Sequence, residues 1–560
     1  MGFNLTVIPP ILRASGSGRP PGSLLRRLPL EVLCQIFTFF IRADPDDVKP
    51  SWLPFFCSLT INEDGWLYPT MLLTWVCSSW RRIVLGYPFF WNSAFISLPA
   101  YLNHPSAQKV LDHYISHSAD LTLDFAIAHR GKYYPEPPED ECVRETVAID
   151  TLYDSLTNEC SRWGRFASTN DIDNYWENYF RSYLDQAPWN VTDYPKLKFI
   201  QWDAGDLPFE ALFVSCPRLQ VYRGSGLWIF NDYLKFQRFS QLVELAIEQL
   251  NWTSIGEILS QFPLLKKFVL SRFTPNESNS NSESEPDDCS SLNKSKYRLS
   301  ISTLCLSLNA IRHVKYWECL ELPCLTTLEL GVPYEEKYEY WPWPEDDPDE
   351  EEQAYLKDYD HTIVKFSEIL SRADAILETV KMDRITGTGV LAFLALHPLI
   401  SDLTLTLVGG HLKIRETLSK LEISSDNNPL VVPSLRSLSI LFDQPPVIVV
   451  DDNITPWKKL DSSMPMLFMC DGLYHLVLSR TNSRLCKYHG VAELEEVSME
   501  SELLWHKGGQ TVYERFSSWI AFAQKKREDF RLEDPLASRP WLEPFDSGSE
   551  SESDGSESSE

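Results

Sequence analysis

A leucine pattern that returns along more than half of the chain limits most strongly what these residues can fold into. The unit is Leu-x-x-Leu-x-Leu, in which other large apolar residues often replace leucine, and a proline often lies two residues before its first position. Successive copies lie roughly 22–24 residues apart where nothing intervenes, a period typical of stacked repeats. The copies begin at Leu197, Leu219, Leu242, Leu265, Ile301, Leu325, Leu377, Ile400, Leu435, Leu473 and, more weakly, Leu494.

The spacing within each copy predicts a short strand whose last two apolar side chains point to one face. Segments between copies, such as 255–262 and 390–397, have the length of a short covering helix. One such unit cannot bury its own apolar face, so its stability must come from stacking on neighbours. We therefore expect an α/β fold in the form of a leucine-rich-repeat-like solenoid over 191–505. The alternative is a set of unrelated buried strands in an ordinary α/β domain.

Two insertions interrupt the period. Residues 274–296 are rich in Ser, Asn and Glu, which predicts a disordered loop. Residues 334–356 place Tyr338, Tyr340, Trp341 and Trp343 just before a run of acids. Aromatic side chains beside acids are suited to contact a basic partner. The alternative is a solvated loop with a few anchoring rings.

The segment before the repeats has a helical period instead. Leu28-Pro29-Leu30-Glu31 opens an apolar run, and proline is favoured in the first turn of a helix. A loop over about 44–69 precedes a second amphipathic segment, 71–85, and Pro88-Phe89-Phe90-Trp91 forms a short third apolar element. These patterns predict two helices followed by a short apolar element.

The same residues resemble the F-box motif, in the variant common among fungal F-box proteins with degenerate leucine-rich repeats. The match consists of Leu28 to Phe37, then Val76-Cys77-Ser78-Ser79-Trp80-Arg81, then Phe90-Trp91. The connection between the first two helices is longer than is typical of the family. The resemblance implies that the unit is a small all-α F-box of three helices, and that it binds Skp1 and through it a cullin scaffold. It also implies that the contact comes from Leu28, Pro29, Val32, Leu33, Ile36, Phe37, Val76, Trp80, Phe90 and Trp91, although some of these must form the core of the unit itself.

The expected domain boundaries follow from these patterns. Residues 1–23 form an arm expected to be disordered, 24–98 the F-box, and 99–190 a flanking region with a strand at 120–125 and a helix at 143–163. Residues 506–545 are expected to cap the array with a helix at 513–530. The Ser-, Glu- and Asp-rich segment 546–560 cannot pack and is predicted to be disordered.

Charge and composition exclude several classes of function. The formal net charge is -28 and no dense Lys/Arg run is present, which argues against a nucleic-acid partner. The scattered cysteines within apolar runs indicate a reduced, intracellular protein, so we expect a cytoplasmic or nuclear location. No apolar stretch approaches the roughly 20 residues needed to cross a bilayer, and we expect no membrane partner.

The sequence shows no constellation of catalytic residues, so we expect a protein that is not an enzyme and has no cofactor or metal. His113 and His117 have the i, i+4 spacing of a metal-binding pair but lack a third ligand nearby. Cys319 and Cys324 are better explained by packing than by zinc. The expected function is that of a substrate-recognition adaptor in a Skp1-cullin-F-box ubiquitin ligase. The alternative is an interaction scaffold that is not coupled to ubiquitination.

Overall fold

The chain folds around one long curved sheet. The computed structural model describes residues 28–42, 57–62, 65–67, 69–104, 106–128, 147–152, 154–156, 158–169, 194–202, 216–227, 241–252, 255–275, 296–331, 350–385, 387–407, 417–423, 431–442, 475–501 and 531–532. The arm 1–23, most of the two insertions, the helix expected at 513–530 and the acidic segment 546–560 lie outside these residues. Residues 350–356, assigned above to the second insertion, instead form the first turns of a helix.

The main sheet has 16 strands, which follow one another almost entirely in chain order. Every neighbouring pair is parallel except β1 and β2, which form an antiparallel hairpin at the first edge. The strands are β1 Leu59–Asn62, β2 Gly65–Leu67, β3 Ser93–Ser97, β4 Leu123–Ala128, β5 Trp163–Thr169, β6 Phe199–Trp202, β7 Val221–Leu227, β8 Glu244–Trp252, β9 Lys267–Pro275, β11 Thr303–Ser307, β13 Thr327–Gly331, β14 Thr379–Ile385, β15 Asp402–Leu407, β16 Ser437–Phe442, β17 Glu496–Ser501 and β18 Arg531–Leu532.

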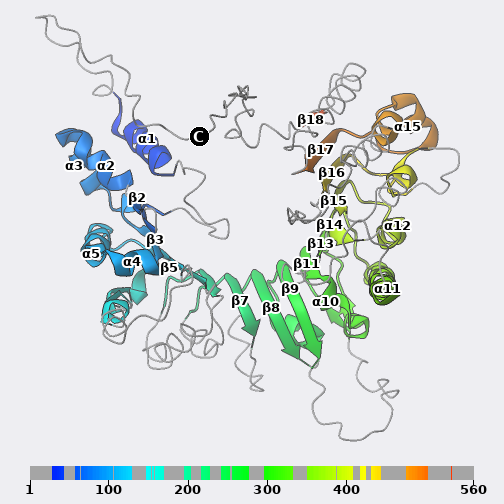
Figure 1. Cartoon of the computed structure of the whole chain (residues 1–560), viewed down its shortest axis with the longest axis horizontal. Coiled ribbons are helices and arrows are strands. Elements are labelled where there is room, and N and C mark those ends of the chain that lie inside the picture. The colour runs from blue at the N-terminus through cyan, green and yellow to red at the C-terminus, as the bar shows by residue number, and fades with distance from the viewer. Residues whose placement is uncertain are drawn as a thin grey trace, which may run out of the picture.

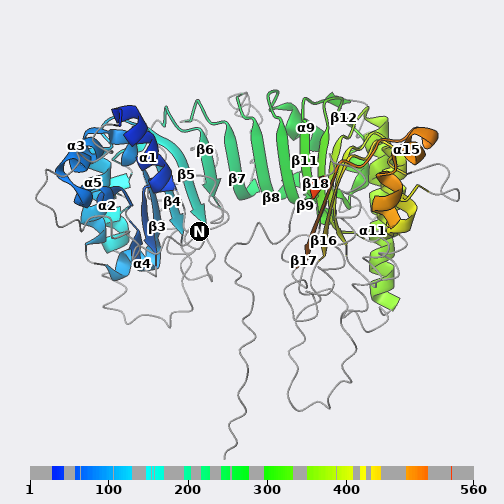
Figure 2. The same ribbon diagram turned by 90° about the horizontal axis from the view of Figure 1, so that it is seen from above.

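Helices cover one side of this sheet and leave the other side facing the centre of an arc (Figure 1). Seen from above, the strands run side by side along the whole arc (Figure 2). A separate pair, β10 Tyr297–Arg298 and β12 Leu320–Glu321, lies among the connections. The helices are α1 Leu30–Arg42, α2 Pro69–Val76, α3 Ser78–Gly86, α4 Leu98–Asn103, α5 Ala107–His117, α9 Ile255–Ser260, α10 Leu308–Ile311, α11 Glu350–Arg372, α12 Gly387–Leu396 and α15 Ser483–His489, with short 3-10 turns η2 Pro88–Phe90, η3 Cys160–Arg162 and η7 Val314–Tyr316.

The repeated leucine positions form continuous columns through the sheet. The second apolar residue of each copy pairs with the corresponding residue of the next strand, and the whole column is buried. This register confirms the predicted α/β class and the strand positions of every predicted copy except the one that begins at Leu473. The column consists of Ile200, Tyr222, Leu245, Phe268, Leu304, Leu328, Val380, Leu403, Leu438 and Val497.

One predicted copy is wrong. The copy that begins at Leu473 was expected to form a strand, but residues 475–480 are helical. Leu473, Leu476 and Val477 also satisfy the i, i+3, i+4 spacing of a helix face, and a short apolar run cannot distinguish the two periods.

The sheet also begins much earlier in the chain than the leucine pattern predicts. The connection at 44–69, expected to be a loop, contributes β1 and β2, and the flanking region 99–190 contributes β4 and β5. The strand expected at 120–125 and the helix expected at 143–163 are present, but shifted to 123–128 and to helical residues within 147–156. The N-terminal unit is therefore not purely helical, and 99–190 is not a linker.

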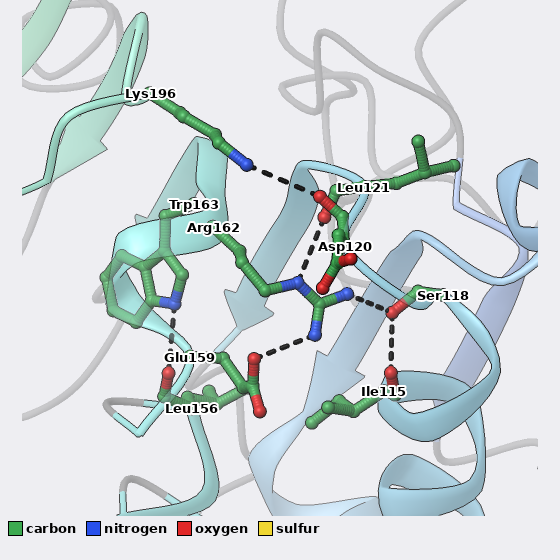
Figure 3. Close-up of polar contacts among 9 residues, drawn as sticks. All are labelled: Ile115, Ser118, Asp120, Leu121, Leu156, Glu159, Arg162, Trp163 and Lys196. Atoms are coloured by element: carbon green, nitrogen blue, oxygen red, sulfur yellow. Dashed lines mark hydrogen bonds and ion pairs between the residues drawn. The ribbon is translucent and has the colours of Figure 1, made fainter.

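An arginine joins consecutive turns in this early part of the sheet (Figure 3). Arg162, in η3, donates from Nε to the carbonyl of Leu121 at 3.1 Å and from a guanidinium nitrogen to Ser118 Oγ at 2.5 Å. It also pairs with Glu159 at 2.7 Å. In the following repeat, Lys196 donates to the carbonyl of Asp120 at 3.3 Å. Each cation donates to one carbonyl of the turn before β4, which links the segments that precede β4, β5 and β6.

A buried histidine on the outer side makes the stability of the array dependent on pH. His397 follows α12, is 4% exposed and packs against Phe393. Burial lowers the pKa of His397 to about 4, against about 6.5 in an unfolded chain. Both states are neutral above pH 6.5. Below it the unfolded state binds the proton first, so stability falls as the pH drops toward 4.

We expect protonation of His397 in the unfolded chain to lower the free energy of unfolding by about 2 kcal/mol at pH 5 and about 3 kcal/mol at pH 4. Urea denaturation between pH 7.5 and 4.5 measures the effect, with His397→Gln as the control because its amide keeps a donor but does not titrate. The stability difference between the two proteins should close or reverse as the pH falls. Parallel curves for wild type and variant would contradict this assignment.

Candidate protein-docking site

The helices at the first end of the arc pack around an aromatic centre. Phe37 of α1 lies with its ring centroid 4.7 Å from that of Trp80 on α3 and 6.1 Å from that of Phe90 in η2. The single helix predicted over 71–85 is interrupted at Cys77, which has an extended backbone and whose Sγ accepts a hydrogen bond from the backbone N–H of Trp80. Cys77 thus acts as the N-cap of α3.

This helical unit shares its core with the sheet. One continuous cluster of buried apolar residues extends from Phe37 through Leu73 and Val84 to Val497 near the far end of the array. The helices of the proposed F-box are therefore the first layer of the array and not a separately packed domain.

The structure divides the predicted contact residues into an interior group and a surface group. Leu33, Phe37, Phe90 and Trp91 are 7%, 1%, 2% and 1% exposed, so they belong to the core of the unit. For these residues the expected direct contact with Skp1 is corrected: a partner cannot touch them in this conformation. Phe37 is turned inward because the aromatic centre of α3 and η2 lies on that side of α1.

The remaining predicted residues reach the surface. Ile36 is 43% and Val76 59% exposed, and Pro29 is exposed as well. Leu28, Val32 and Trp80 are partly exposed. The structure also adds apolar residues that were not predicted to be contacts, namely Leu30 at 40%, Phe39 at 74%, Phe40 at 39%, Trp75 at 57%, Leu85 at 39% and Phe89 at 40% exposed.

Helix α1 consequently carries two apolar stripes. At 100° per residue, Leu33, Phe37 and Ile41 define the side that packs on the core. Val32, Ile36, Phe39 and Phe40 lie on the next side of the helix, and all four reach solvent. We call these four residues the outer stripe. The polar residues Glu31 and Gln35 occupy the third side, and none of the four residues of the outer stripe is charged.

Cys34 of α1 is not activated as a nucleophile. Burial, and secondarily the charge of Glu31, raise the pKa of the Cys34 thiol, so Cys34 stays protonated at neutral pH. Its place between the core side and the polar side of α1 is that of a packing residue. What these helices can offer is an apolar surface for another protein.

The inner face of the sheet changes character along the arc. Near its start, Phe95, Ala126, Ala167 and Phe199 form a second, smaller buried cluster on the face opposite the main core. Asp124 is also buried there and pairs with Arg165 at 2.5 Å. Burial raises the pKa of Asp124 in spite of the opposing effect of Arg165.

Further along, the inner face becomes polar and accessible. Glu244 on β8 contacts both Arg223 on β7, at 2.8 Å, and Lys267 on β9, at 3.8 Å. From β11 onward, every second residue faces inward and is partly or fully exposed at most positions. These inward residues are mainly hydroxyl-bearing or charged, and they include Thr303, Thr327, Glu329, Lys381, Asp402, Ser437, Ser439 and Ser498. Such a face is suited to polar contacts with a protein.

The candidate metal ligands do not assemble into a site. The rings of His113 and His117 lie 4.1 Å apart and pack against Trp91, with His117 Nδ1 2.9 Å from the carbonyl of His113. Cys319 is buried and its thiol donates to the carbonyl of Tyr316, while Cys324 is exposed. Within the described ranges, no three His, Cys, Asp or Glu side chains are placed to hold a metal ion.

Comparisons with known proteins leave the family open. No family model matches the chain, and no curated protein matches it. Among solved structures, one that resembles it is a crystal structure of a Bacteroides fragilis protein determined as a structural-genomics target. The two chains are 12% identical in sequence, with a TM-score of 0.26, over 56% of this chain and 80% of the other. None of the described helices is long and apolar enough to cross a membrane.

Proposed function

We propose that this protein is the substrate-recognition adaptor of a Skp1-cullin-F-box ubiquitin ligase. The observation that carries the proposal is the outer stripe of α1, which lies beside a complete core and still exposes Ile36 and Phe39 at 43% and 74%. An apolar stripe on a helix that has already buried its other apolar side favours a partner protein. The motif resemblance identifies that partner as Skp1.

Further exposed apolar residues lie on the elements that surround the same aromatic centre. Trp75 and Val76, at the end of α2, and Phe89, beside the central Phe90 at a centroid distance of 4.0 Å, belong to the helices that α1 packs on. Aromatic residues of this kind commonly contribute most of the binding energy of an interface. The proposed docking surface therefore consists of the outer stripe together with Trp75, Val76 and Phe89.

The body of the protein would then position a target. An adaptor forms no covalent bond; it raises the effective concentration of a target lysine near the conjugating enzyme. The shared core between the docking helices and the array supports this function, because it fixes the direction in which a target bound on the polar inner face is presented. The finer fold expectation, a three-helix F-box on a leucine-rich-repeat solenoid, is part of this proposal.

The test is co-purification of the full chain with Skp1, followed by size-exclusion chromatography and affinity measurement. Ile36→Glu and Phe39→Glu each place a charge on the outer stripe without touching the core, and we expect each to weaken binding at least about 100-fold. Gln35→Glu is the matched control, since it adds the same charge on the polar side of the same helix. Thermal midpoints should be unchanged in all variants.

Two results would change the conclusion. Failure of the folded wild-type chain to bind Skp1 would overturn the adaptor proposal. Binding that is lost on Phe39→Glu, with target turnover in cells that does not depend on Phe39, would favour a scaffold that uses Skp1 without directing ubiquitination. The full chain is needed for these tests because the helices share their core with the sheet.

A further inference from the structure

A basic and aromatic surface lies at the far end of this acidic protein, on α15. Arg484, Lys487 and Tyr488 have i, i+3 and i, i+4 spacing, so they share one face of the helix. Arg484 and Lys487 are exposed, and Tyr488 is 85% exposed with its ring 5.0 Å from that of His489. We call Arg484, Lys487 and Tyr488 the α15 face.

The side of α15 opposite the α15 face packs against the rest of the protein, whereas the α15 face itself is exposed. Cys486 is 1% exposed and its thiol donates to the carbonyl of Arg480 at 3.3 Å. Asn482 caps the first turn, accepting from the backbone N–H groups of Arg484 and Leu485. Neither Arg484 nor Lys487 forms an ion pair with another residue in the part of the chain that the structure describes. The helix is therefore anchored from one side and presents cations on the other.

We propose that the acidic segment 546–560 of the same chain binds the α15 face. Its charges are complementary: it contains no Lys or Arg, and its acids are Asp546, Glu550, Glu552, Asp554, Glu557 and Glu560. The exposed pair of cations beside an exposed tyrosine offers this segment both charge pairing and an aromatic contact.

The connectivity places this segment within reach. Strand β18 pairs with β17 through Arg531 and Leu532, and β17 follows α15 directly in the chain. Both strands and α15 lie at the same end of the arc (Figure 1). The residues from 533 to 545 can span roughly 45 Å when extended. Binding within one chain acts at an effective concentration near the millimolar range, so a few charge pairs and one aromatic contact suffice.

Such a contact would occupy the outer side of the last repeats. It leaves the polar inner face and the outer stripe of α1 free, so this inference does not depend on the proposed ligase function. The contact is electrostatic, so it should strengthen with the negative charge of the segment and weaken as the salt concentration rises.

The test is zero-length carbodiimide cross-linking of the full chain, with mass spectrometry of the joined peptides. Lys487 is the reporter, and Lys109, an exposed lysine on α5 at the opposite end of the arc, is its matched control. We expect joining of 546–560 to Lys487 to exceed joining to Lys109 at least about tenfold. It should fall by a similar factor in about 0.5 M salt.

A double variant separates docking from simple attraction. Arg484→Glu combined with Tyr488→Ala keeps the reporter lysine and all the reactive acids of 546–560, and it should remove most of the product. All substituted side chains described by the structure are exposed, so the thermal midpoint should not change. Equal joining at Lys109 and Lys487, no joining at either, or a product that survives Arg484→Glu/Tyr488→Ala would overturn the proposal.

Discussion

Replacing Arg480 with methionine is expected to destabilise the last repeats by about 3–5 kcal/mol. The Arg480 side chain is fully buried, and its guanidinium donates to three backbone carbonyls: Leu421 at 3.0 Å, Val432 at 2.9 Å and Val431 at 2.8 Å. Burial lowers the pKa of Arg480 to about 10, so it remains charged at neutral pH. Methionine fills a similar volume but donates nothing, which leaves buried carbonyls without these partners.

The location of these carbonyls increases the expected loss. Val432 is fully buried with φ of +44°, a backbone conformation that a β-branched residue adopts only under strain. One bond from Arg480 ends on Val432 and another on its neighbour. The arginine therefore stabilises the turn that leads into Leu435 and β16.

Thermal or urea denaturation of Arg480→Met, with hydrogen exchange of residues 417–442, measures this effect. Protection should be lost there first, because each repeat in an array contacts only its neighbours. Arg480→Lys is the control: it keeps the positive charge but cannot reach all three carbonyls, so its stability should fall between those of the other two proteins. A variant with methionine that is as stable as wild type would show that the bonds to Leu421, Val431 and Val432 contribute nothing net.

The part of the fold that depends on side-chain period could be predicted from the sequence. Leucines at fixed spacing, such as Leu325 and Leu328, specify a strand and its buried face, and the structure places both in the core. The earlier strands could not be predicted in this way. Their equivalent positions hold Trp91 and Ala94 before and in β3, and Trp163 and Phe166 in β5, so the core positions stay apolar while the leucine pattern is lost.

The exposed side of α1, on which the proposed docking surface rests, could be predicted only in outline, for a different physical reason. Apolar residues occupy two adjacent sides of α1, and helical period alone cannot tell which side packs inward. Position relative to α3 and η2 decides this, because Phe37 meets Trp80 and Phe90 there. Phe39, the most exposed apolar residue of α1, has no sequence feature that separates it from a core phenylalanine.

Because Trp91 lies in the interior, its replacement is expected to lower the stability of the fold. Its indole N–H donates to the carbonyl of Val84, seven residues earlier, at 2.8 Å. Trp163 and Trp317 make the same contact, to Leu156 at 2.9 Å and Ala310 at 3.2 Å. A hydrogen bond that recurs three times with the same separation of seven residues has a structural role in the fold. We therefore expect Trp91→Ala to cost about 3–5 kcal/mol, as for other buried tryptophans.

A milder substitution distinguishes an interior role from a docking role. Trp91→Phe keeps a ring but leaves the Val84 carbonyl without its donor, which should cost about 1–2 kcal/mol. Skp1 binding measured well below the melting temperature should change no more than about threefold, because Trp91 is 1% exposed. Trp163→Phe is the matched control, since it removes the same bond far from α1. Loss of Skp1 binding in Trp91→Phe at an unchanged melting temperature would instead place Trp91 in the interface, as the motif alone had indicated.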